Sequence, residues 1–211
     1  DVLWTKPSEL SFYSALGLPI IIAPPIGSQE EFNKKWLLRL GSGIPQENPR
    51  YSSQWFMFMG VYDNVTTHVR LHQATLPAGT DVDAAASNWT LNATPLFTLT
   101  VGQFDATRAE VPYFILMEDG ALRIYYAGSD GGVLGTNAWA ISYAEWNGSA
   151  WARHGSAVLS GTEAWELYTG VATVLNPSVV FYDGLYHMYY QAGGNFNIGY
   201  ANSADGVTWS N

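Results

Sequence analysis

The chain has 211 residues, 47% of them hydrophobic, and a formal net charge of −9. Only nine residues are Lys or Arg, and they form no cluster, which excludes the basic surface that nucleic acids and anionic membranes require. The chain has no cysteine and no apolar run of helical membrane-spanning length, so disulfides, thiolate chemistry and a membrane helix are excluded as well.

Aromatic residues make up 15% of the chain and charged residues 13%, about half the usual charged share. This composition is typical of stacked β-sheets and of surfaces that handle sugars. We expect most of the aromatic side chains to fill the space between sheets. The length suits one all-β domain.

The first hundred residues carry the least regular pattern. Residues 1–7 resemble the end of an outer strand, and an inner strand is predicted over either 18–22 or 36–40. Two further strands are predicted over 54–60 and 68–74. Trp89 then begins a last, short strand of the same unit.

A clearer unit follows. Strands are predicted over 110–117, 122–128 and 139–144, and Trp151 opens a fourth. Asp-Gly and Asn-Gly dipeptides separate them, which is a strong hairpin signal between apolar runs.

The last unit repeats the second in register. Residues 188–193 match the strand over 124–128, residues 197–201 match the strand over 140–144, and Trp209 matches Trp151. A repeated four-stranded antiparallel unit that cannot bury both of its faces alone indicates a β-propeller.

The chain is therefore predicted to be one propeller domain over residues 1–211. Clear blades are expected at about 51–100, 105–160 and 165–211, with a degenerate or partial blade over 1–50. Three clear blades are also compatible with a partial propeller, with self-association, or with a second chain that completes the ring.

The residues of the last unit support a more specific interpretation. Trp165-Glu166, the Asn-Pro-Ser-Val of 176–179, the Asp-Gly of 183–184 and the run over 198–209 together resemble the five-bladed β-propeller glycosidase superfamily. This superfamily includes arabinanases and β-xylosidases of glycoside hydrolase family 43, and invertases and levanases of family 32. Residues 203–209 also resemble the Asp-box turn of sialidases, which keeps a sialidase-like propeller as a minor alternative.

The resemblance implies a secreted hydrolase, extracellular or periplasmic, whose partner is a neutral carbohydrate of the arabinan, xylan or fructan type. It implies no cofactor. A structural Ca²⁺ occurs in such channels, but no ligand cluster in this sequence demands one. His68 and His72 share one strand face without an evident third ligand, so no metal site is predicted.

Glycoside hydrolysis requires two carboxyl groups on either side of the scissile bond. The resemblance makes Glu110, in Ala109-Glu110-Val111-Pro112, the general acid, because family 43 carries a Glu just before a Pro at an inner-strand start. The second carboxylate, acting as base or nucleophile, is either Asp105 or one in a missing blade.

Five further residues are predicted to contact the substrate near the inner-strand starts. They are Arg108, Trp165, Glu166, Tyr168 and Asn176. Asn176 stands where relatives often have Asp, and an amide binds a hydroxyl but cannot act as a base. This leaves a second hypothesis open beside the glycosidase, namely a non-catalytic carbohydrate-binding or scaffolding propeller.

Overall fold

The computed structural model describes residues 3–5, 20–22, 35, 39, 43–45, 54–77 and 88–211. The chain divides into two compact units, one of Asp1–Trp55 with Leu76–Ala84 and the other of Phe56–Thr75 with Ala85–Asn211.

The first unit contains a three-stranded sheet in the order β1 (Leu3–Thr5), β2 (Ile20–Ile22), β3 (Gly43–Pro45). Both pairings are parallel. This differs from the antiparallel pairing expected of a blade. Of the two predicted inner strands, 18–22 coincides with β2, whereas 36–40 lies outside the described residues except for Arg39.

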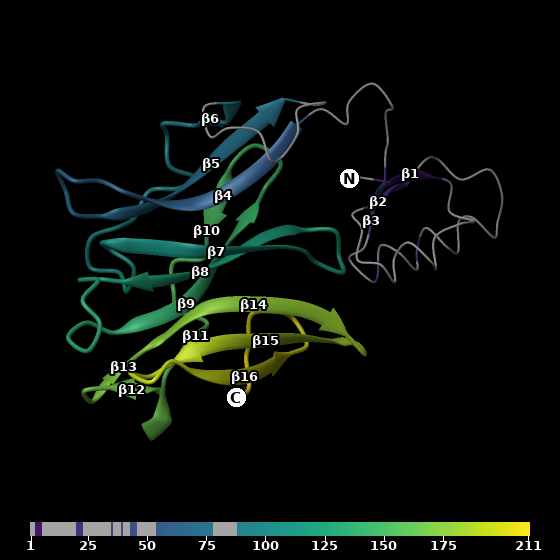
Figure 1. Cartoon of the computed structure of the whole chain (residues 1–211). Coiled ribbons are helices and arrows are strands. Elements are labelled where there is room, and N and C mark those ends of the chain that lie inside the picture. The colour runs from purple at the N-terminus through teal and green to yellow at the C-terminus, as the bar shows by residue number, and fades with distance from the viewer. Residues whose placement is uncertain are drawn as a thin grey trace. The chain divides into compact units, whose positions relative to one another are not determined.

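The second unit consists of successive sheets, which Figure 1 shows as layers. The first layer contains β4 (Gln54–Tyr62), β5 (Val69–Pro77) and β6 (Thr90–Leu91). The middle layer contains β7 (Arg108–Leu116), β8 (Leu122–Ser129), β9 (Trp139–Trp146), β10 (Trp151–Arg153) and β11 (Leu159–Ser160). The last contains β14 (Val174–Tyr182), β15 (Leu185–Ala192) and β16 (Asn197–Ser203), and is preceded by a 3-10 turn (Ala164–Glu166) and the short hairpin of β12 (Leu167–Tyr168) and β13 (Val171–Ala172).

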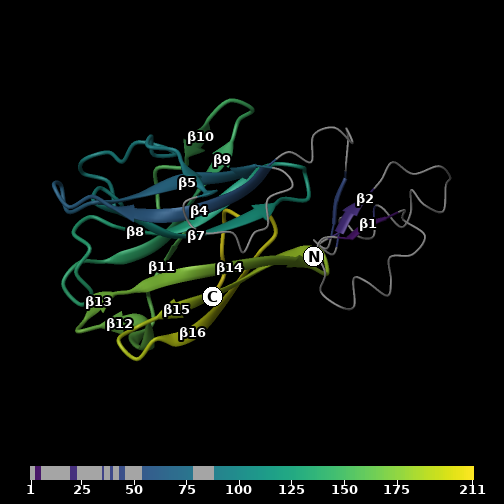
Figure 2. The same ribbon diagram turned by 45° about the horizontal axis from the view of Figure 1, so that its top comes forward.

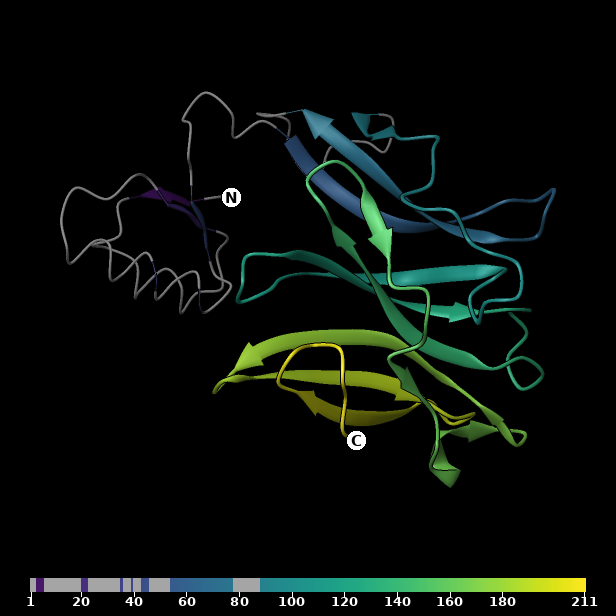
Figure 3. The same cartoon turned by 180° about the vertical axis from the view of Figure 1, so that it is seen from behind.

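The middle layer is a complete blade of four antiparallel strands, β7 to β10, and we call it the middle blade. The last blade pairs β14, β15 and β16, and the chain then crosses back over this sheet (Figure 3), where Ser210 bridges Asn202. In the first blade, the bond from the Leu96 amide to the Leu71 carbonyl repeats that from Val158 to Ile141. By this equivalence β4, β5 and β6 are second, third and fourth strands, as predicted.

Successive blades are connected by the same kind of parallel residue pairing, which occurs at two places. The first residue of β5, Val69, pairs in parallel with Arg108 at the start of β7. Trp139 at the start of β9 pairs in the same way with Thr173, next to the start of β14. The inner strands β7 and β14 therefore enter the fold in equivalent positions, and Figure 2 shows them side by side.

Both inner strands carry a bulge at the same place. In β7 it lies between Glu110 and Tyr113, and in β14 between Leu175 and Ser178. Aligning the bulges makes Leu175 the equivalent of Glu110. Asn176 is thus one position further along and does not stand where the middle blade has its carboxylate.

Two apolar clusters hold the blades together. Leu71, Ile124 and Tyr126 belong to the cluster that joins first and middle blades. Tyr125, Ile141, Val179, Met188 and Tyr190 belong to the one that joins middle and last. Along β15, buried and exposed positions alternate, so only one sheet face contributes to this core.

The predicted all-β fold of antiparallel sheets is confirmed, and it fits part of a propeller whose sheets do not close in the described residues. Within the same part of the chain, no helix has the length and apolar character needed to cross a membrane.

Candidate functional site

Glu110 lies near the start of the inner strand β7, at the edge of its bulge, and pairs with Ala127 of β8. Gly60 of β4 approaches it closely: a Cβ added to Gly60 would lie 3.2 Å from the Cβ of Glu110 and 3.0 Å from a methyl group of Val69. The carboxyl group is thus partly enclosed by the first blade, and 26% of the side chain remains exposed.

This enclosure favours the protonated form of the Glu110 carboxyl group. Loss of hydration raises its pKa, and the nearby Arg108 guanidinium opposes the rise. The two side chains are 3.9 Å apart at their closest nitrogen and oxygen atoms. Arg108 also lies over the ring of Tyr62, and its Nε is buried without a hydrogen-bond partner among the described residues.

Asp105 has a different environment. Its side chain is fully buried, one carboxylate oxygen pairs with Arg153, and the other accepts a 2.7 Å hydrogen bond from the Tyr126 hydroxyl. Burial and this carboxylate together raise the pKa of Tyr126. Both oxygens are occupied within the blade, so this geometry favours a structural role and gives no support to the prediction of a base.

Glu166 is also fully buried. Its Oε2 accepts hydrogen bonds from the Thr162 and Glu163 amides, and its Oε1 accepts them from Tyr190 and Asn211. Burial by itself would raise the pKa of Glu166, but these bonds outweigh it and lower the pKa. The arrangement fixes the 3-10 turn of Ala164–Glu166 and gives Glu166 no free oxygen for a ligand.

The same turn presents Trp165. The indole stacks on the buried Tyr190 ring at an interplanar angle of 23°, and Gly199 leaves the space that it occupies. Tyr168 lies against Gly135 on one side and Gly194 on the other, where an added Cβ would clash with its ring. Both aromatic side chains nevertheless stay exposed, at 41% and 39%.

Asn176 is exposed, has a φ of 54°, and donates a hydrogen bond to Gln191. Its role in binding, like those of Arg108, Trp165 and Tyr168, stays a prediction. His72, one of the two strand histidines, contacts the Asn92 carbonyl at 2.9 Å through Nδ1, as a satisfied sheet histidine does. No group of three or more metal-binding side chains occurs among the described residues.

One part of the sheet edge where β14 starts was not predicted from the sequence. Two adjoining cavities of about 310 Å³ and 520 Å³ share Tyr168 and Gly194. The β15–β16 loop adds Asn195 and Phe196 to their walls, and β16 adds its first residue, Asn197. The signal was present as Gly-Gly-Asn-Phe-Asn, a loop with amides around one aromatic residue, but nothing in the sequence indicated what this loop faces.

Comparison with protein-family models finds no match, and comparison with curated proteins finds none either. Solved structures do match. A thermostable family-43 glycoside hydrolase aligns with a TM-score of 0.57 and 21% identity over 75% of this chain and 50% of its own. An α-L-arabinofuranosidase from Lactobacillus brevis aligns with a TM-score of 0.55 and 18% identity, over 74% and 50%. A levansucrase mutant from B. megaterium aligns at 0.50 and 8%, over 76% and 49%.

These solved structures are five-bladed β-propeller glycosidases, and the present chain spans about half the length of each. The resemblance stated from the sequence is thereby confirmed at the level of the fold. The fold is thus that of part of a β-propeller, the architecture of these solved structures. The number of blades in the whole protein stays a prediction.

Proposed function

We propose that this chain belongs to a glycoside hydrolase that acts on a neutral oligo- or polysaccharide of the arabinan, xylan or fructan type. The observation that carries the proposal is Glu110: a partly desolvated carboxyl group with a raised pKa, at the start of an inner strand, in a fold shared with glycosidases. A raised pKa favours the protonated form of the carboxyl group, and general acid catalysis of glycosidic cleavage requires this form.

Arg108 contributes by position. Its guanidinium group lowers the pKa of Glu110, against the rise caused by burial, and places hydrogen-bond donors beside the carboxyl group. A sugar hydroxyl next to the scissile bond would be held by these donors, while the bulge keeps the carboxyl group at the edge of β7.

The second carboxylate is not identified. In the described residues the last blade has Leu175 where the middle blade has Glu110, and the first blade shows no inner strand. This observation favours the alternative function, a propeller that binds carbohydrate without cleaving it. The two hypotheses differ in whether a base is supplied from elsewhere in the protein.

The experiment is sugar release from arabino-, xylo- and fructo-oligosaccharides by the full chain and by the Glu110→Gln variant. The glycosidase hypothesis predicts release by the wild type and a loss of at least about a hundredfold in the variant, since general acid catalysis contributes about that much. An Asp119→Asn variant, altered in an exposed hairpin turn, is the control and should retain wild-type release. Binding without release from any oligosaccharide would support the alternative function.

A further inference from the structure

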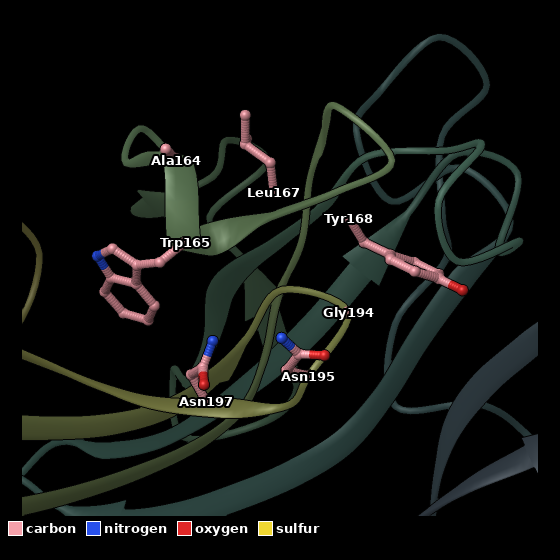
Figure 4. Close-up of a pocket in the computed structure, with 7 residues that line it drawn as sticks. All are labelled: Ala164, Trp165, Leu167, Tyr168, Gly194, Asn195 and Asn197. Atoms are coloured by element: carbon pink, nitrogen blue, oxygen red, sulfur yellow. The ribbon is translucent and has the colours of Figure 1, made fainter.

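The two adjoining cavities described above form one groove, which we call the Trp165–Tyr168 groove. It runs between the loops at residues 131–137, 164–170 and 193–197, all of them at the edge of the sheet where β7 and β14 start. In Figure 4 the side chains of Trp165, Asn197, Asn195 and Tyr168 follow one another along it.

The lining of this groove is aromatic and polar but carries no charge. Its aromatic members are Trp165, Tyr168 and Phe196, the last half exposed. Asn195 and Asn197 are exposed, and their side-chain amides make no hydrogen bond within the described part of the chain. Flat apolar faces beside free amide donors and acceptors suit a neutral ligand that has both C–H faces and hydroxyl groups.

Several features of the fold hold the aromatic rings in place. Trp165 has one face on Tyr190, so its other face is available to a ligand. Glu166 fixes the turn beneath it through four hydrogen bonds. Rings fixed in this way lose little conformational entropy when they bind, which raises affinity.

The groove adjoins the candidate catalytic residue. Gly132, in its wall, lies against the Arg108 side chain, and a Cβ added there would be 2.2 Å from Nε. Arg108 in turn pairs with Glu110. A saccharide chain that leaves Glu110 over Arg108 therefore enters the groove beside Gly132.

We propose that the Trp165–Tyr168 groove is a distal subsite that binds sugar units beyond those at Glu110, so that the protein prefers long oligosaccharides over disaccharides. The proposal rests on the proposed carbohydrate function and deepens it by naming where the chain of the substrate lies.

The test titrates the full-length chain, as the Glu110→Gln variant to prevent turnover, with arabino-, xylo- and fructo-oligosaccharides of increasing length in a calorimeter. Affinity is expected to increase with length. Adding Trp165→Ala, or separately Asn197→Ala, should weaken binding of the long members about tenfold, equivalent to ~1.4 kcal/mol, and leave disaccharide binding unchanged. Asn197 is exposed, so its truncation tests the groove even if the tryptophan variant folds poorly.

Tyr182→Ala is the matched control, because Tyr182 is an exposed aromatic residue at the opposite end of β14. It should bind as the parent does. Affinity that is independent of length, variants that bind like the control, or no binding of any oligosaccharide would each overturn the subsite. If binding depends on Trp165 but the wild type releases no sugar, the hydrolase proposal fails and the subsite stands. If release depends on Glu110 while the groove variants have no effect, the subsite fails and the hydrolase proposal stands.

Discussion

Arg108 and Glu110 form a pair in which the guanidinium group alters the pKa of the carboxyl group. Desolvation raises the pKa of Glu110, and the positive charge 3.9 Å away lowers it again. The balance sets the pH above which a general acid loses its proton. In the proposed hydrolase, Arg108 is therefore the residue through which the pH dependence of catalysis can be adjusted.

Arg108→Gln should move the alkaline limb of the kcat/KM profile to higher pH. Without the guanidinium the carboxyl group keeps its proton to a higher pH, so the active protonated form persists further. Arg108→Lys retains the positive charge and should leave the limb near its wild-type position. The measurement is the pH profile of sugar release, in which the position of the limb is compared and not its height. A limb that stays in place in Arg108→Gln would show that Glu110 is not the titrating acid.

Glu166 is the second residue whose environment determines its role. Replacing it with Gln puts an amide donor against atoms that already donate, so Glu166→Gln should lower the free energy of unfolding by about 1.5–3 kcal/mol in urea at pH 7. The exposed Glu118→Gln is the control and should stay within about 0.5 kcal/mol. A variant as stable as the control would refute the anchoring role.

The pH dependence of this effect has a definite sign. The pKa of Glu166 is lower in the folded state, so its stabilisation is present above the unfolded value and is lost as pH falls through the folded one. The difference between wild type and Glu166→Gln should therefore shrink below about pH 4, near the unfolded pKa of Glu.

At the scale of elements, the bulges of β7 and β14 place the candidate site. Val111 has a φ of 53° and Asn176 a φ of 54°, and each precedes a proline. Positive φ is tolerated by Asn but is strained for a β-branched residue. Val111, next to Glu110, is therefore in a strained backbone conformation that a glycine at this position would adopt without strain.

Val111→Gly should increase the free energy of unfolding by about 0.5–1 kcal/mol, because relief of the left-handed conformation exceeds the entropic cost of glycine. Asn176→Gly, at the equivalent position, should gain less. Chemical denaturation of both variants beside the wild type checks the difference. Destabilisation by Val111→Gly would mean that the valine side chain contributes packing that outweighs its strain.

At the scale of the whole molecule, the blade repeat shows what the last blade leaves uncovered. Strand pairing makes Tyr189 the equivalent of Tyr125, and Ile198 the equivalent of Ile141. Tyr125 and Ile141 are fully buried between blades, whereas Tyr189 and Ile198 are exposed. The face that carries them has the composition of a blade–blade interface, and no sheet covers it among the residues that the structure describes.

Such a face should make this 211-residue chain self-associate, because exposed apolar patches of this kind drive association. Introducing Tyr189→Lys together with Ile198→Lys should lower the mean mass measured by light scattering at high protein concentration. Val65→Lys, at an exposed turn between β4 and β5, serves as the control. A wild-type chain that stays monomeric at all concentrations would contradict the prediction.

Local sequence patterns were sufficient to predict most strands of the middle and last blades and their repetition. Turn dipeptides and alternating apolar residues act locally, so the strands of the middle and last blades and their register could be predicted from them. The choice of Glu110 as general acid came from the resemblance to propeller glycosidases, and its catalytic role stays a prediction. The parallel pairing of β1, β2 and β3 could not be predicted, because a short apolar run does not specify which strand it pairs with.

The surroundings of the side chains, in contrast, follow from the three-dimensional fold. It enclosed Asp105 and Glu166 among partners from distant segments, aligned Leu175 with Glu110, and brought three separate loops together as the Trp165–Tyr168 groove. The physical reason is that burial, pKa and ligand access depend on contacts between residues far apart in sequence, which local patterns do not encode.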